Sequence, residues 1–272
     1  MKKCAWMFGL AGMLRLMTGC ATPSTSATLA PVRPPEELAT GFINKTLAFE
    51  GTLYRYVVYV PYTYTPRNAW PLIVFLHGAG ERGNDGLLQT EVGIGTAIRR
   101  FPDRFPAIVL FPQCPNDEFW DVMFAPIERM MACTREEYAI DPSRIYLTGL
   151  SMGGYGAWLW ASMRPDTFAA LMPICGGGNV EEIAARLGRP LSGDYGTPEE
   201  RIRRLATLPT WVFHGDDDAT VPVERSREMV AALQAAGGNV QYTEFPDTGH
   251  NSWDRAYAHK NAIRWLFKQR RP

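Results

Sequence analysis

Residues 144–163 read RIYLTGLSMGGYGAWLWASM, and this stretch indicates how the chain folds. The run at 144–147 predicts a strand, and the apolar run at 155–163 predicts a helix. Between them, GLSMG at 149–153 places Ser151 between two glycines. A serine on such a tight turn from strand to helix is held in a strained backbone with its hydroxyl exposed. The start of the helix also directs backbone N–H groups toward that oxygen.

The pattern around Ser151 is specific only in this context, because glycine and serine are common residues. A serine N-cap on a glycine-rich turn is the simpler alternative. With a strand before it and a helix after it, the turn is more typical of a nucleophile. We therefore predict that Ser151 is a nucleophile at the carboxyl end of a strand.

Strands and helices alternate along the rest of the chain. Further strands are predicted at 52–60, 71–76, 107–111, 168–174, 211–213 and 240–245. Further helices are predicted at 126–138, 223–236 and 257–269. Short apolar strands separated by helices are typical of a mostly parallel sheet with helices on both faces. We predict such an α/β fold, with its chemistry at the carboxyl ends of the strands.

A serine hydroxyl needs a base before it becomes a good nucleophile. The chain has four histidines. His250 lies in a predicted loop, DTGHNSW at 247–253, from which a side chain can reach a cleft. His77 and His214 each precede a glycine at a strand end and are predicted to brace loops, whereas His259 is predicted to lie on the surface of a helix. His250 is therefore the predicted base.

The base in turn needs a carboxylate that fixes its tautomer and stabilises the imidazolium. Asp216, Asp217 and Asp218 follow one another after the strand at 211–213, and spacing does not choose among them. A cation site is an alternative interpretation of this cluster, but no loop of alternating ligands follows it. The chain order of serine, acid and histidine is the order found in α/β-hydrolases.

The loop after the strand at 71–76 reads HGAGERG, at 77–83, and its small residues let the backbone approach a substrate closely. An N–H group of this loop and that of Met152 are candidates to stabilise an oxyanion. The same loop fits the dinucleotide pattern G-x-G-x-x-G, which requires a helix directly after it and an acid at the end of the next strand. Asn84-Asp85-Gly86 interrupts any helix, and the next strand ends in Pro112-Gln113, so we exclude a Rossmann site.

Taken together, the motifs resemble one known family. They are FLHGAGERGND (75–85), FPQCPNDEFW (111–120), DPSRIYLTGLSMGGYGAW (141–158), PICGGG (173–178), FHGDDDATVP (213–222) and GHNSWD (249–254). They are similar to the prolyl-oligopeptidase-like serine esterases, close to polyhydroxybutyrate depolymerases and feruloyl esterases. The similarity covers most of residues 40–270.

This resemblance implies an α/β-hydrolase fold and hydrolysis of carboxylic esters with no cofactor and no metal. The family pattern HG-x-x-D-x-x-VP places the acid at Asp218, so the resemblance chooses among the three aspartates. It also implies Ser151 as nucleophile and His250 as base, with the N–H groups of Ala79 and Met152 as oxyanion donors. The predicted activity is that of a serine carboxylesterase acting on aryl or feruloyl esters, short-chain esters or polyesters.

Two other functions remain open on the sequence alone. One is a peptidase of the prolyl-oligopeptidase type, although such relatives carry a large propeller domain for which this chain leaves no room. The other is a catalytically inactive, surface-binding lipoprotein, against which an intact set of serine, acid and histidine argues.

Two further features bear on the substrate. Trp120, Tyr155 and Trp253 lie near the site loops in the sequence and are candidates to line an aryl pocket, although aromatic residues more often belong to a core. The connection at 179–207 is longer than in the close relatives and contains two segments with a helical pattern. It is interpreted either as a lid over the acyl pocket or as a surface excursion.

The N-terminus resembles a bacterial lipoprotein signal. Lys2 and Lys3 precede an apolar stretch that ends in Thr18-Gly19-Cys20. We predict a signal peptide at 1–19, a lipid on Cys20 that attaches the protein to a membrane, a Pro/Ser/Thr-rich tether at 20–38, and a catalytic domain at 39–272. The expected location is the cell envelope, with the outer membrane favoured by the alanine after Cys20. Alternatives are a plain secretory signal, with a periplasmic or secreted protein, and an N-terminal anchor.

Composition excludes other classes. Lys and Arg number 28 and Asp and Glu number 28, so the chain has no electrostatic basis for binding nucleic acid. No long apolar run follows the N-terminus, so no later membrane span is expected. Beyond Cys4 and Cys20, the remaining Cys114, Cys133 and Cys175 allow at most one internal disulfide and are predicted to be small buried residues.

Overall fold

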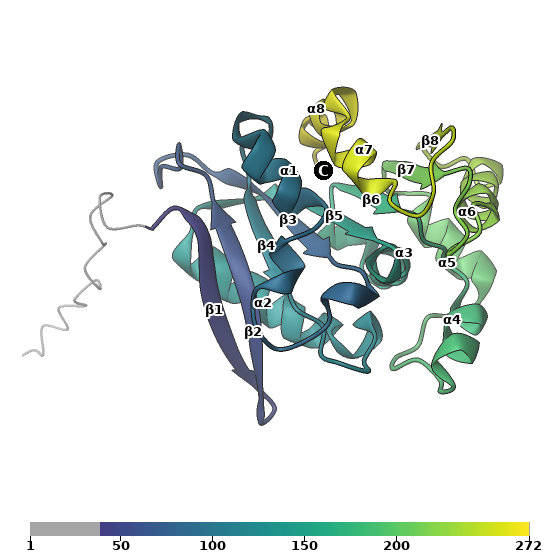
Figure 1. Ribbon diagram of the computed structural model, residues 1–272, viewed down its shortest axis with the longest axis horizontal. Helices are drawn as coiled ribbons and strands as arrows, with labels where there is room; N and C mark the ends of the chain where they lie inside the picture. The colour runs from purple at the N-terminus through teal and green to yellow at the C-terminus, as the bar shows by residue number, and fades with distance from the viewer. Residues whose placement is uncertain (1–38, 272) are drawn as a thin grey trace, which may run out of the picture. The chain divides into compact units, whose positions relative to one another are not determined.

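The computed structural model describes residues 39–271, which form one eight-stranded sheet flanked by helices (Figure 1). Its strands are β1 (Gly41–Phe49), β2 (Thr52–Val60), β3 (Trp70–Leu76), β4 (Ile108–Pro112), β5 (Ile140–Leu150), β6 (Ala170–Ile174), β7 (Thr210–Gly215) and β8 (Val240–Phe245). Its helices are α1 (Ile94–Arg100), α2 (Phe124–Glu137), α3 (Met152–Met163), α4 (Val180–Leu187), α5 (Pro198–Leu205), α6 (Glu224–Ala235), α7 (Trp253–Ala258) and α8 (Lys260–Lys268). The predicted signal peptide (1–19), Cys20 and the tether (20–38) lie outside the described residues.

The sheet has the strand order β1-β2-β4-β3-β5-β6-β7-β8. β1 and β2 form an antiparallel hairpin, and β2 pairs antiparallel with β4. From β4 to β8 all pairings are parallel. The prediction of an α/β-hydrolase fold with a mostly parallel sheet is therefore confirmed.

Both faces of the sheet are buried, and β3 shows why. Leu72, Val74 and Leu76 point to the face covered by α2, α3 and α6, while Ile73 and Phe75 point to the face covered by α1, α7 and α8 (Figure 1). Successive side chains of a strand alternate in this way. Each fully buried apolar side chain contributes about 1.5–3 kcal/mol relative to an exposed one. The two apolar layers hold the sheet in place, and with it the strand ends that carry the site.

The connection at 179–207, here called the insertion, forms the two helices that its pattern predicts. α4 begins at Asn179, whose side chain accepts a backbone hydrogen bond, and it ends at Gly188 in the left-handed conformation. α5 begins with a reciprocal capping box between Thr197 and Glu200. α5 packs against α3 and α6, so the insertion is attached to the face of the sheet that those helices cover.

Three local features differ from the prediction or were absent from it. The single helix expected at 257–269 is wrong, because the chain breaks at His259 into α7 and α8. His259 is not a free surface residue, since its Nδ1 accepts a hydrogen bond from Ala262 N (3.2 Å) and caps α8. β1 and α1 were not predicted. β1 is an edge strand with polar residues along it, and α1 is only seven residues long, so neither has a strong periodic signal.

The three cysteines of the described residues, Cys114, Cys133 and Cys175, are free thiols, and two of them are buried. The prediction of small buried residues is therefore confirmed for Cys114 and Cys175, while Cys133 is half-buried. Within residues 39–271, no helix combines the length and the apolar character that a membrane span requires.

Candidate active site

Ser151 occupies a strained turn between β5 and α3. Its φ of 53° and ψ of −119° lie in a region that residues other than glycine avoid at a cost of about 1–3 kcal/mol. Two hydrogen bonds hold the turn, from Ser151 N to Ile174 O (3.0 Å) and from Tyr155 N to Ser151 O (3.1 Å). The geometry matches the tight, exposed turn predicted from GLSMG.

The glycines that flank Ser151 are required by close backbone approach. A Cβ on Gly149 would overlap Gly153 O, and a Cβ on Gly153 would overlap Leu76 O. Neither neighbour is a flexible side chain, so neither can move aside cheaply. The two glycines therefore allow β3, β5 and α3 to approach closely enough to present the serine.

Ser151, His250 and Asp218 form a continuous hydrogen-bonded row. His250 Nε2 lies 2.9 Å from Ser151 Oγ, and His250 Nδ1 lies 2.7 Å from Asp218 Oδ2. Because a carboxylate oxygen accepts, Nδ1 carries the proton and Nε2 is free to accept the serine proton. The fold thus brings together three residues from the ends of β5, β7 and β8.

Asp218 is held as a buried carboxylate. Its Oδ1 accepts hydrogen bonds from Thr220 N (2.8 Å) and Val221 N (2.9 Å), while its Oδ2 faces His250. Burial acts to raise the pKa of Asp218, but the hydrogen bonds from His250 and the two backbone groups outweigh it and leave the pKa below its usual value. Asp218 is therefore ionised when it meets the imidazole. Asp216 and Asp217 are exposed and make no contact with His250.

His214 is a buried neighbour of the Asp218 carboxylate. Its Nε2 lies 3.0 Å from Val221 O and 3.2 Å from Asp218 Oδ2, so this nitrogen carries the proton. Its Nδ1 then accepts from the Ser226 hydroxyl at 2.7 Å. Burial lowers the pKa of His214, which keeps the ring neutral. This buried position agrees with the expectation that His214 braces a loop.

His77 braces the loop that follows β3. Its Nδ1 donates to Gly78 O (2.6 Å), its Nε2 accepts from Cys114 N (2.9 Å), and burial lowers its pKa to about 4. Trp120 donates to His77 O (3.2 Å) and packs edge-on against the ring. The loop then begins a single helical turn at Ala79.

Ala79 and Met152 are each the first residue of a helical segment, so their N–H groups have no acceptor within that segment. Both residues line a cavity with Ser151. This placement is the one that the predicted oxyanion donors need, and their assignment to that role stays a prediction.

The cavity beside Ser151 has a volume of about 360 Å³. It is lined by Ala79, Arg82, Phe119, Ser151, Met152, Tyr155, Ile183, Arg186, Leu187, Thr220 and Val221. Of the three aromatic residues proposed for a pocket, the fold brings only Tyr155 here. Trp120 is fully buried beneath the loop, and Trp253 packs edge-on against His250 (5.3 Å) outside the cavity lining.

One set of residues has the spacing to hold a cation. Ligand atoms of Cys175, Asp218 and His250 lie within 4.8 Å of one another. Metal ions bind the thiolate rather than the thiol, but burial raises the pKa of Cys175 to about 12. Asp218 and His250 are already hydrogen-bonded to each other. The arrangement therefore fits proton transfer better than metal binding.

Comparison with known proteins identifies the family. The family model of the prolyl oligopeptidase family matches residues 122–270, which is more than half of the chain. The chain belongs to the prolyl oligopeptidase family. The resemblance stated from the motifs and the predicted fold are both confirmed by this match.

The individual relatives of this prolyl oligopeptidase family member share 26–38% of its residues over the aligned regions. It is 26% identical over 123 residues to a poly(3-hydroxybutyrate) depolymerase of Ralstonia pickettii, covering 39% of this chain and 25% of that protein. It is 26% identical over 213 residues to an uncharacterized secreted protein of Arthroderma benhamiae, covering 67% of this chain and 21% of that protein. The crystal structure of a thermostable esterase is 38% identical with a TM-score of 0.69, covering 85% of this chain and 63% of that one. The chain thus spans a quarter or less of these two curated relatives.

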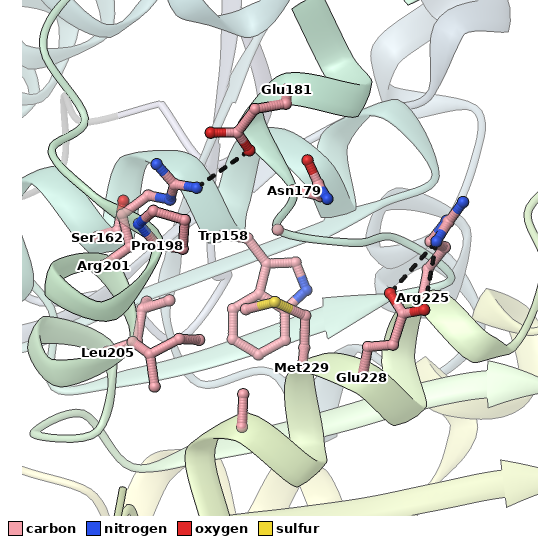
Figure 2. A pocket seen from close by; sticks show the side chains of 13 residues that line it. Trp158, Ser162, Asn179, Glu181, Pro198, Arg201, Leu205, Arg225, Glu228 and Met229 are labelled. Carbon is pink, nitrogen blue, oxygen red and sulfur yellow. Dashed lines mark hydrogen bonds and ion pairs between the residues drawn. The ribbon is translucent and has the colours of Figure 1, made fainter.

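A second, smaller cavity is lined in part by the insertion (Figure 2). Its volume is about 190 Å³, and it is bounded by α3, the insertion and α6. Trp158 and Met229 form its floor, while the Glu181–Arg201 and Arg225–Glu228 ion pairs lie at its rim (Figure 2). None of its lining residues belongs to the Ser151 row.

Several residues that line the Ser151 cavity were not predicted from the sequence. Phe119 comes from the loop after β4, whereas Ile183, Arg186 and Leu187 come from the insertion. Arg82 lies in the loop predicted to supply an oxyanion donor, but no role was predicted for its side chain. The FPQCPNDEFW and HGAGERG motifs contain Phe119 and Arg82, so motif context is the one signal in the sequence that points to either residue. The insertion residues have no comparable signal.

Proposed function

We propose that this protein is a serine carboxylesterase that acts through an acyl-serine intermediate. The observation that carries the proposal is the Ser151–His250–Asp218 row, with heavy-atom separations of 2.9 and 2.7 Å and Ser151 in a left-handed turn. Membership of the prolyl oligopeptidase family and similarity to a depolymerase and an esterase support the same reaction class.

The geometry favours a two-step acyl transfer. His250 Nε2 removes the proton from Ser151 Oγ as the oxygen attacks the ester carbonyl, and Asp218 stabilises the resulting imidazolium. The N–H groups of Ala79 and Met152 stabilise the oxyanion. His250 then gives its proton to the departing alcohol. Water attacks the acyl-serine by the same route, which releases the acid and restores the serine hydroxyl.

The test is hydrolysis of 4-nitrophenyl butyrate by matched variants. We expect Ser151→Ala and Asp218→Asn to lower kcat by a factor of about 10⁴, because the first removes the nucleophile and the second the charge that orients the base. Asp217→Asn is the control, since Asp217 is exposed and lies outside the row. Full activity in Ser151→Ala would contradict the assignment. Turnover of prolyl amides in preference to the ester would favour the peptidase alternative.

We also infer that the insertion forms one wall of the acyl pocket. Ile183 and Leu187 of α4 line the cavity that contains Ser151, and Phe119 and Tyr155 complete its apolar lining. A volume of about 360 Å³ is at the small end of ligand pockets. It suits a short acyl chain, a single aromatic ring or one unit at the end of a polyester. Burial raises the pKa of Tyr155 to about 12, so its buried hydroxyl stays protonated.

A series of esters with acyl chains of increasing length tests whether the insertion forms this wall. Ile183→Ala removes a buried side chain from the cavity and should shift the preference among 4-nitrophenyl esters toward acyl chains longer by about two carbons. Ile202→Ala is the matched control, because Ile202 belongs to the insertion but lines the second cavity instead. An unchanged chain-length profile in a folded Ile183→Ala protein would favour the interpretation of the insertion as a surface excursion.

Export and lipid attachment complete the proposal. The similarity to a secreted protein supports export, and the signal at 1–19 with Cys20 after it supports a lipoprotein of the cell envelope. Growth with radioactive palmitate should label the wild type and not Cys20→Ser. Label absent from the wild type would favour a plain secretory signal, and label retained by Cys20→Ser would contradict lipid attachment at Cys20.

A further inference from the structure

The cavity beside Ser151 carries positive charge on two sides. Arg82, from the loop after β3, and Arg186, from α4 of the insertion, both line it. None of the residues that line this cavity is an aspartate or a glutamate. Guanidinium groups bind carboxylates through paired, charge-assisted hydrogen bonds. The lining therefore favours a substrate that carries a negative charge of its own.

Arg82 has no counter-ion within residues 39–271. Its Nε is buried without a hydrogen-bond partner, and no carboxylate of this part of the chain lies within 4.0 Å of its guanidinium. The thiol of Cys114 lies nearby, but burial raises the pKa of Cys114 to about 12, so it is neutral. A partly buried cation without a counter-ion is costly, and a bound anion would offset that cost.

The acidic residues around Arg82 are engaged elsewhere. Asp121 and Glu118 pair with Arg189 at 2.8 and 3.4 Å. The Asp85 side chain accepts backbone hydrogen bonds from the two residues of the following turn. Glu81, next to Arg82 in the chain, does not line the cavity, and burial raises its pKa. No acid of this region is positioned to neutralise Arg82.

Arg186 shares its carboxylate partner with a second arginine. It pairs with Glu182 at 2.8 Å, and Glu182 also pairs with Arg225 at 2.8 Å, while Arg225 in turn pairs with Glu228 at 3.3 Å. The guanidinium of Arg186 lies 5.9 Å from the ring centroid of Tyr155, on the cavity side of α4. Its side chain is half exposed and can move toward a ligand in the cavity.

We propose that Arg82 and Arg186 form an anion subsite, and that the preferred substrates are esters bearing a second, ionised carboxylate. Half-esters of dicarboxylic acids and hydroxy-acid esters with a free carboxyl end have this chemistry. The inference rests on the proposed esterase activity and names the substrate class of that same site. The cleavage chemistry is unchanged, because neither arginine is hydrogen-bonded to Ser151, His250 or Asp218.

The test compares matched esters that differ in one charge. Mono-4-nitrophenyl adipate is set against its neutral methyl ester, which places the charge on the acyl side. 4-Butyryloxybenzoate is set against its methyl ester, which places the charge on the alcohol side. For at least one pair we expect kcat/KM of the wild type to favour the carboxylate about tenfold or more, from the usual strength of hydrogen bonds to charged groups. The preference should fall in 0.5 M salt.

Variants assign the preference to the two arginines. Arg82→Gln and Arg186→Gln should each reduce the charged-to-neutral ratio several-fold, and together they should bring it near one. Arg82→Lys keeps the charge and should retain part of the ratio. Arg203→Gln, an exposed charge of the insertion outside the cavity, is the control and should leave the ratio unchanged.

The outcomes separate the two proposals. A wild-type ratio of one or less for both pairs, with neutral esters cleaved in a Ser151-dependent way, overturns the anion subsite and leaves the esterase standing. Ser151-independent turnover overturns the esterase itself. A preference that survives in folded Arg82→Gln and Arg186→Gln proteins also overturns the subsite. Adipate as a competitive inhibitor of neutral-ester hydrolysis gives a second readout on the wild type, so the test does not depend on a variant that folds poorly.

Discussion

The nucleophile turn (149–153) and the insertion (179–207) border the same cavity but are held by different forces. The nucleophile turn is fixed by backbone against backbone, with Gly149 and Gly153 packed directly on main-chain oxygens. The insertion is joined to the rest of the domain by ion pairs, Arg189–Asp121 and Glu182–Arg225, and by a few buried side chains, Ile183, Tyr195 and Leu205. Close packing tolerates almost no change, whereas ion pairs near solvent are individually weak.

This difference separates the reacting groups from the groups that select a substrate. The proposed nucleophile lies where geometry allows least freedom, which suits a reaction sensitive to sub-ångström placement. The pocket wall lies where residues can change without affecting the sheet. A change in the nucleophile turn should therefore affect folding, whereas a change in the insertion should affect specificity first.

The largest loss of stability is expected from a single methyl group added to the nucleophile turn. Gly153→Ala places a Cβ on Leu76 O and should destabilise the fold by about 3 kcal/mol or more, because backbone cannot move aside cheaply. Urea unfolding measures the loss. The control is Gly80→Ala, since a Cβ on Gly80 meets nothing within 4 Å. Equal stability of the two variants would show that the turn has more freedom than its contacts imply.

The loop that carries Ala79 should add a pH dependence to stability. Burial lowers the pKa of His77 from 6.5 to about 4, so the unfolded chain takes up a proton at a higher pH than the folded one. Stability from this residue is therefore complete above pH 6.5 and is lost as the pH falls toward 4, by about 3 kcal/mol in total at 1.36 kcal/mol per pKa unit.

His77→Gln provides the comparison for this pH effect. Glutamine can still donate to Gly78 O and accept from Cys114 N, but it does not titrate. Denaturant unfolding between pH 7 and pH 4 should therefore show a smaller loss of stability for His77→Gln than for the wild type. Equal losses of stability in the two proteins would mean that His77 takes up its proton in the folded protein as readily as in the unfolded chain.

The sequence predicted the nucleophile turn and the residues around it far better than it predicted the role of the insertion. Alternating apolar residues, glycines and the order of serine, acid and histidine are local signals, and they pointed to Ser151, His250 and the run of three aspartates at 216–218. The choice of Asp218 among three aspartates came from family resemblance, since only the fold shows which carboxylate meets the imidazole. Arg186 and Ile183 could not be assigned, because which face of α4 meets the cavity depends on how the insertion docks.

Trp120 and Trp253 show a second limit of the sequence. Both lie next to site loops in the chain, yet Trp120 is buried under His77 and Trp253 packs outside the cavity lining. Proximity in sequence does not determine the direction of a side chain. Phe119, the neighbour of Trp120, points into the cavity instead.

The smallest effect is expected where the insertion is tied to the loop after β4. Arg189 makes two hydrogen bonds to the fully buried Asp121 carboxylate, at 2.8 and 3.0 Å, and Ser192 N donates to the same carboxylate at 2.7 Å. Arg189→Gln should cost about 2 kcal/mol, because it leaves the buried Asp121 carboxylate without its cation, although Arg189 is a third exposed and Asp121 keeps the Ser192 bond. Since Asp121 lies two residues from Phe119, the variant should change KM for bulky acyl groups more than kcat for butyrate. An equal fall in kcat for all esters would mean that this ion pair positions the reacting groups as well, and that the insertion is not energetically separate from the nucleophile turn.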